Sequence, residues 1–99
     1  MHFVFSYDLS IDAGIRRNEV VAQIEGLLPA NNFVRRLSTF YIVHVDNVEE
    51  WNTILSNMTN LSRGIPETFH FIMSPCTTGG RYNGILPRNE WDAINNLSD

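Results

Sequence analysis

The segment that most constrains the fold is an apolar run at residues 2–10. Its aromatic side chains alternate at Phe3, Phe5 and Tyr7, so they share one face of an extended strand. The other face is also largely apolar until it reaches a carboxylate at Asp8. Such a run is typical of an interior strand that is covered on at least one side. We therefore predict a central β-strand that ends close to Asp8.

Two helices are expected from apolar residues that recur every three or four positions. The first runs from Ile15 to Leu28 and is ended by Pro29. The second follows Asp46, where Asn47 and Glu50 have capping-box spacing. Its apolar stripe is predicted to face the core and consists of Val48, Trp51, Ile54, Leu55, Met58 and Leu61.

Three further strands are expected around the second helix. The β-rich stretch from Phe33 to Val45 is long for one strand, so we expect two strands with a bend at residues 37–39. A single long strand with a bulge is the alternative. The last strand is predicted at residues 67–74 and is ended by Pro75.

The resulting order, β-α-β-β-α-β, predicts an α+β fold of the ferredoxin-like type. In this fold an antiparallel four-stranded sheet carries two helices on one face. Residues 1–78 would form this domain, and residues 79–99 a C-terminal tail with a short helix that packs on the sheet or on a partner subunit. The tail would expose Tyr82 and Trp91 unless something covers them, so we place both at the interface of a homodimer.

Composition narrows the class of protein. A chain of 99 residues that is 43% hydrophobic suits one packed domain. Its single cysteine excludes an intramolecular disulfide framework. No apolar run is long enough to cross a bilayer and no signal peptide is recognised, so we expect no membrane association and a cytoplasmic location.

Charge gives a mixed indication about nucleic acid. The net charge is −4, which argues against a surface that binds nucleic acid through bulk charge alone. Every basic residue is arginine, however, and four of the seven form two pairs, Arg16-Arg17 and Arg35-Arg36. Arginine suits bidentate phosphate contacts, so these four residues are candidates for nucleic-acid binding. Alternatively, they form ion pairs with the nearby acids Glu19, Glu25, Glu49 and Glu50.

Asp8 has two open interpretations. It could shape the turn or cap the first helix together with Ser10 and Asp12. It could instead be a functional carboxylate, because the carboxyl ends of strands in α/β proteins commonly carry chemistry.

Several short motifs together resemble a known family. They are Tyr7-Asp8-Leu9-Ser10, then Arg16-Arg17, then a helix carrying Val20, Val21, Ile24 and Leu27, then Ser38-Thr39-Phe40. This layout resembles the small CRISPR-associated protein of spacer acquisition, the second Cas protein of that system. The virulence-associated protein D family shares the same architecture. The resemblance covers roughly residues 2 to 74.

The resemblance implies a ferredoxin-like homodimer in which Asp8 faces its counterpart across the interface. Asp8 would be the catalytic residue and the ligand of Mg²⁺, or alternatively Mn²⁺, in an endonuclease that cleaves RNA or DNA. Arg16 or Arg17 would contact phosphate nearby, with Ser38 and Phe40 close to the site. One carboxylate holds Mg²⁺ weakly, whereas two related by a twofold axis would make a paired site.

Two other functions remain open at this stage. The first is a non-catalytic dimeric scaffold or interaction protein of the same fold. The second is a small-ligand regulatory domain, because ferredoxin-like dimers often bind small molecules between subunits.

Overall fold

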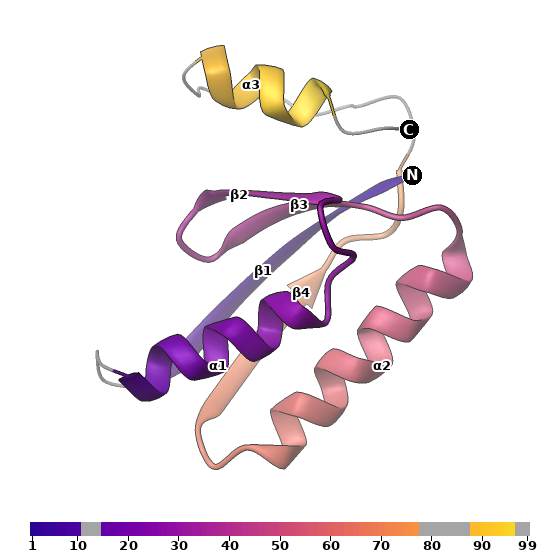
Figure 1. The fold of residues 1–99 in the computed structure, drawn as a ribbon. Helices are drawn as coiled ribbons and strands as arrows, with labels where there is room; N and C mark the ends of the chain where they lie inside the picture. The colour runs from indigo at the N-terminus through magenta and orange to yellow at the C-terminus, as the bar shows by residue number, and fades with distance from the viewer. Residues whose placement is uncertain (11–14, 78–87, 97–99) are drawn as a thin grey trace.

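The computed structural model (Figure 1) describes residues 1–10, 15–77 and 88–96. For Ile15, Arg36, Glu90, Trp91 and Asn95 only the backbone is described. The elements are β1 (His2–Ser10), α1 (Ile15–Gly26), β2 (Phe33–Leu37), β3 (Phe40–His44), α2 (Val48–Gly64), β4 (Thr68–Met73) and α3 (Arg88–Asn95).

The four strands form one sheet in the order β2-β3-β1-β4, and all neighbouring strands are antiparallel. β1 is therefore parallel to β2, with β3 between them, and β3 is parallel to β4, with β1 between them. Each β-α-β unit thus encloses a strand of the other, which is the split β-α-β arrangement. Helices α1 and α2 lie on the same face of the sheet (Figure 1). The predicted ferredoxin-like α+β fold is confirmed.

The core lies between the sheet and the two helices. Along β1, the side chains of Phe3, Phe5, Tyr7 and Leu9 are buried on the helix side, whereas Asp8 is exposed. Because side chains alternate along a strand, Asp8 points to the opposite face, called here the far face. The prediction of a central strand with a carboxylate near its end is confirmed.

The first helix is shorter than predicted. It ends at Gly26 rather than at Leu28. The N–H groups of Leu27 and Leu28 donate to the carbonyls of Ile24 and Glu25, three residues back, at 3.1 Å. These bonds close tighter turns than an α-helix, and the chain leaves the helix before it reaches Pro29.

The stretch after α1 is a hairpin, as expected, and the single-strand alternative is wrong. β2 and β3 are separated by Ser38 and Thr39, and the pairing register shifts between Arg35 and Leu37. The Arg35 Nε donates to the Ser38 carbonyl at 2.8 Å. This hydrogen bond links the Arg35 side chain in β2 to the backbone of the turn.

The start of α2 follows the predicted cap. The Glu50 N–H donates to the Asn47 side chain at 2.8 Å, and the Asp46 N–H donates to the Glu50 carboxylate at 3.1 Å. Ile54 and Met58 are buried as expected. The assignment of Val48 to the core stripe is wrong, because its side chain is 48% exposed in the first turn of the helix.

Helix α3 lies on the far face, alongside β2 (Figure 1). Ile94 of α3 and Ile42 of β3 are both buried, yet neither belongs to the core beneath α1 and α2. Tyr82 lies outside the described residues, and the side chain of Trp91 does too. Their assignment to a dimer interface, and the division of the chain at residue 78, therefore stay predictions.

Among the helices that the structure describes, none is long and apolar enough to cross a membrane.

Candidate functional site

Asp8 lies on the far face near the end of β1, with Ser6 and Ser10 on the same side of the strand. Its carboxylate is exposed and makes no hydrogen bond or ion pair with any residue that the structure describes. It therefore caps no described helix N–H, and Asp12, the other candidate cap, lies outside the described residues. The carboxylate is available to a ligand from solvent.

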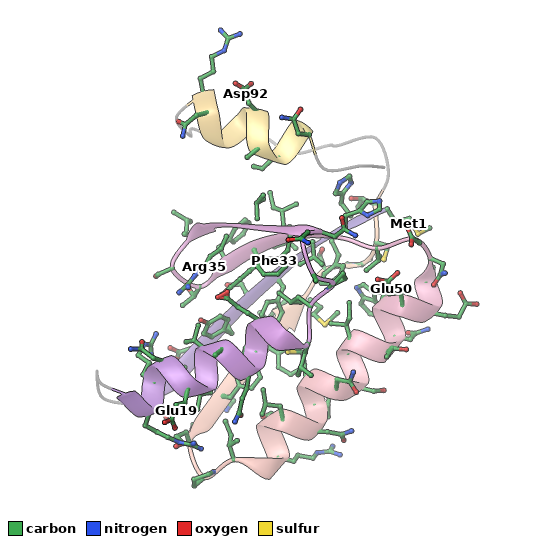
Figure 2. All side chains as sticks on the ribbon, viewed as in Figure 1. Met1, Glu19, Phe33, Arg35, Glu50 and Asp92 are labelled. Atoms are coloured by element: carbon green, nitrogen blue, oxygen red, sulfur yellow. The ribbon has the colours of Figure 1, made fainter. Side chains whose placement is uncertain are left out.

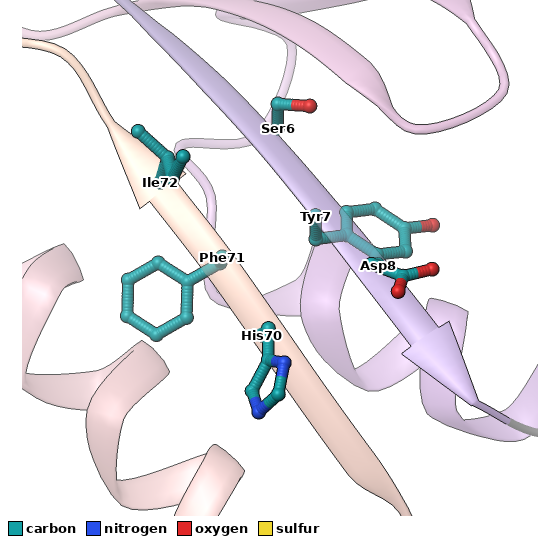
Figure 3. A pocket seen from close by; sticks show the side chains of 6 residues that line it. All are labelled: Ser6, Tyr7, Asp8, His70, Phe71 and Ile72. Atoms are coloured by element: carbon teal, nitrogen blue, oxygen red, sulfur yellow. The ribbon is translucent and has the colours of Figure 1, made fainter.

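Asp8 lines a shallow groove between β1 and β4, shown in Figure 3 and called here the Asp8 groove. The groove has a volume of about 240 Å³ and is lined by Ser6, Tyr7, Asp8, His70, Phe71 and Ile72. Ile72, which also lines the groove, is 75% exposed, so an apolar surface adjoins the Asp8 carboxylate. The groove is open enough to admit a ligand or a second protein surface.

The described residues of one chain do not by themselves complete a metal site around Asp8. In the described part of the chain, no group of three or more His, Cys, Asp and Glu side chains is placed to hold an ion. Mg²⁺ commonly binds through one or two carboxylates and fills its remaining positions with water and substrate phosphates. The predicted Mg²⁺ or Mn²⁺ site would therefore need ligands from a second copy, from water or from substrate.

Two of the four candidate arginines lie at the start of α1 and have protein partners. Arg16 forms a two-pronged ion pair with Glu67, which precedes β4, and approaches Glu19 at 3.5 Å. The hydrogen bonds and charge of Glu67 raise the pKa of Arg16, and those of Arg16 lower the pKa of Glu67. Arg17 donates to the Leu9 carbonyl at 3.1 Å, which brings its guanidinium to the end of β1.

The second arginine pair lies in β2. Arg35 approaches Glu25 at 3.6 Å, and its guanidinium carbon stands 5.6 Å from the ring centre of Tyr41. Figure 2 shows Arg35 at the edge of the sheet beside α1. Arg36 follows it in the strand, but its side chain is not described.

The alternative that the arginines pair with acids is thus confirmed for Glu19 and Glu25, and no such pair forms with Glu49 or Glu50 among the described residues. The pairing with Glu67 was missed. The Arg16–Glu67 pair joins residues far apart in sequence, and no local sequence motif predicts such a pair.

Two further features escaped sequence reasoning. His70 of β4 lies directly opposite Asp8 of β1, which only the strand register reveals. The hydroxyl groups of Tyr7 and Tyr41 are buried, and neither forms a well-aligned hydrogen bond with a described residue. Their rings lie 6.0 Å apart between β1 and β3.

A second groove adjoins the start of α2. It is lined by Met1, Val48, Trp51, Pro75 and Cys76 and is mostly apolar. Burial raises the pKa of the Cys76 thiol, so the protonated form is favoured. A nucleophilic cysteine requires the opposite shift, so this environment does not activate the Cys76 thiol.

The Arg16–Glu67 pair gives a testable prediction. In Arg16→Ala, the pKa of Glu67 should rise back toward its ordinary value, because the hydrogen bonds and the charge that lower it are removed. In the native protein, stabilisation from Glu67 is present above its unfolded pKa and is lost as pH falls through its folded pKa. An NMR titration of the Glu67 carboxyl measures the shift.

The matched control for this titration is Arg63→Ala in the last turn of α2, which removes an arginine that forms no ion pair among the described residues. The Arg63→Ala substitution should leave the pKa of Glu67 unchanged. An unchanged Glu67 titration in Arg16→Ala would contradict the ion pair.

Comparisons of this chain with protein-family models, with curated proteins and with solved structures found no match. The family resemblance drawn from residues 2 to 74 therefore stays a prediction.

Proposed function

We propose that the protein is a homodimeric, metal-dependent nuclease whose metal site is built around Asp8 from both copies. The observation that supports this most directly is the exposed carboxylate of Asp8, which has no described partner and lies in a groove on the far face of the central strand. Because this carboxylate is exposed and is engaged by no described side chain or N–H group, a ligand can reach it from solvent.

The dimer is part of the proposal because the described residues of one chain supply too few ligands. In a twofold interface the same patch meets itself, so a residue close to the axis comes near its own counterpart. An axis through the Asp8 groove would bring the two Asp8 carboxylates together and would cover the exposed Ile72. Both consequences support placing the interface on the far face over β1 and β4.

The chemistry follows from the paired carboxylates. Mg²⁺ or Mn²⁺ held between them would polarise a phosphodiester of RNA or DNA and activate a water molecule for attack. Arg17 is suited to contact phosphate, because its guanidinium already lies at the end of β1. Arg16 and Arg35 would have to exchange their carboxylate partners for phosphate to do the same.

The test is cleavage of structured RNA, single-stranded RNA and duplex DNA by the purified chain with Mg²⁺ or Mn²⁺. We expect Asp8→Ala to lower the rate by about a hundredfold or more, as removal of a group that stabilises a transition state commonly does. Ser10→Ala is the matched control, because it changes an exposed side chain on the same face of β1.

Failure of the native chain to cleave any of the three substrates would overturn the proposal, and so would either of two further results. One is cleavage by Asp8→Ala at the native rate. The other is a monomer in sedimentation at micromolar concentration, since the paired site needs two copies.

A non-catalytic dimeric scaffold or interaction protein is the second candidate. It is favoured by the partners that Arg16, Arg17 and Arg35 already have, together with the net charge of −4. These features reduce the positive surface available to a nucleic-acid backbone. This candidate predicts a stable dimer that cleaves none of the three substrates and contacts its partner through Tyr82 and Trp91.

A further inference from the structure

His70 is the side chain best placed to act with Asp8. The two residues are direct partners in the antiparallel pairing of β1 with β4. Directly opposed residues have Cβ atoms about 4.5–5.5 Å apart and project from the same face of the sheet. Both are exposed, both line the Asp8 groove, and His70, like Asp8, makes no hydrogen bond or ion pair with a described residue.

Figure 3 shows both side chains leaving neighbouring strands, with the carboxylate and the imidazole ring turned away from each other. Exposed side chains exchange rotamers on the picosecond-to-nanosecond timescale. Rotation about the Cα–Cβ bonds can therefore bring an imidazole nitrogen and a carboxylate oxygen toward a common ion without moving the backbone.

We propose that His70 is a second metal ligand beside Asp8 and that the site prefers a divalent ion of the Ni²⁺, Co²⁺ or Zn²⁺ class to the Mg²⁺ or Mn²⁺ of the proposed function. This rests on the proposed function for the role of Asp8 and for the twofold dimer. Imidazole nitrogen suits these borderline ions, whereas Mg²⁺ and Mn²⁺ favour carboxylate, carbonyl and water oxygens. Adding His70 to Asp8 therefore changes which metal the site prefers.

The dimer makes the ligand set sufficient. Among the residues that the structure describes, the groove of one chain offers one carboxylate and one imidazole, which are too few to hold a transition ion tightly. Two copies related by an axis through the Asp8 groove offer two of each. This mixed nitrogen and oxygen set can bind a four-coordinate ion, or a higher-coordinate one whose remaining positions hold water.

The alternative role for this pair is purely structural. As a cross-strand pair on an exposed sheet surface, Asp8 and His70 would contribute only about 0.2–1 kcal/mol to stability. Such a pair would give the protein no preference among metal ions. Metal selectivity therefore separates the two roles, whereas stability measurements alone would not.

The test is isothermal titration of the untagged full chain with Ni²⁺ and, separately, with Mn²⁺. We expect His70→Ala to weaken Ni²⁺ binding by at least about tenfold, because even the loss of an outer-shell partner costs about that much. Mn²⁺ binding should change by less than about twofold, because this ion depends on carboxylate oxygens. Asp8→Ala should weaken the binding of both ions.

The matched control is Thr68→Ala, which lies opposite Ser10 on the same two strands and should alter neither titration. Circular dichroism checks that each variant is folded. Equal Ni²⁺ affinity in the native protein and in His70→Ala would overturn the proposal, as would an equal loss of Ni²⁺ affinity in Thr68→Ala.

The outcome separates this inference from the proposed function. If the native chain and His70→Ala cleave nucleic acid equally and bind Ni²⁺ equally, the nuclease proposal stands and the role of His70 fails. If Ni²⁺ binding depends on both Asp8 and His70 but no substrate is cleaved, the metal site stands and the nuclease proposal fails.

Discussion

Replacing Phe5 with alanine is expected to lower the free energy of unfolding by about 3–5 kcal/mol, the range for removing a buried aromatic side chain. Phe5 is fully buried in β1. Its ring centre lies 5.7 Å from Tyr7, 5.7 Å from Tyr41 and 6.0 Å from Phe71. These rings come from three adjacent strands, so the substitution leaves a cavity whose walls belong to the rigid centre of the sheet.

Urea unfolding measures this loss as a lower midpoint at an unchanged m-value. Asn57→Ala is the control, because Asn57 is exposed on α2, away from the Asp8 groove. A surface substitution of this kind is expected to stay within about 0.5 kcal/mol of the native protein. If the two variants lost similar amounts of stability, Phe5 could not occupy the core position described here.

Raising the pH above about 10 is expected to destabilise the protein through Tyr41. Burial is the main cause that raises the pKa of Tyr41, and the neighbouring Tyr7 and Glu25 raise it further, whereas Arg35 opposes them. In the unfolded chain a tyrosine ionises near pH 10, while in the folded protein Tyr41 stays protonated. Its contribution to stability is therefore complete below about pH 10 and is lost as the pH rises toward the folded pKa.

The slope of this loss approaches about 1.4 kcal/mol per pH unit for a single group. Urea unfolding of the native protein and of Tyr41→Phe, at several pH values from about 9 to 11.5, isolates the contribution of Tyr41 because the other titrating groups are shared. The stability of Tyr41→Phe should fall less steeply above pH 10. Parallel curves for the two proteins would contradict the pKa shift.

Much of the fold could be predicted from patterns among residues close together in the sequence. The alternation in residues 2–10 identified β1, and the spacing of Asn47 and Glu50 located the start of α2. Both signals depend on neighbours within a few residues, which a sequence displays directly. The split of the Phe33–Val45 stretch followed from strand length alone.

What the sequence did not predict depends on contacts between distant segments. Glu67 binds Arg16, and His70 lies opposite Asp8, only because β4 pairs with β1 in one particular register. A shift of one residue would turn His70 to the helix side of the sheet. The strand pattern was therefore enough to identify Asp8 as a candidate, whereas its cross-strand partner His70 could be identified only from the structure.

The interior position of β1 has a consequence for how the chain reaches its folded state. β1 is the first element in the sequence, yet both strands that flank it, β3 and β4, follow much later. Neither edge of this apolar strand can be paired by a local hairpin, so closing the sheet requires contacts of long sequence range, which slow folding.

During synthesis, β1 must stay unpaired until β3 has been made, and its second edge stays open until β4 is complete. Aggregation of the newly made chain is therefore most to be expected through β1, the strand that is best protected once folding is complete.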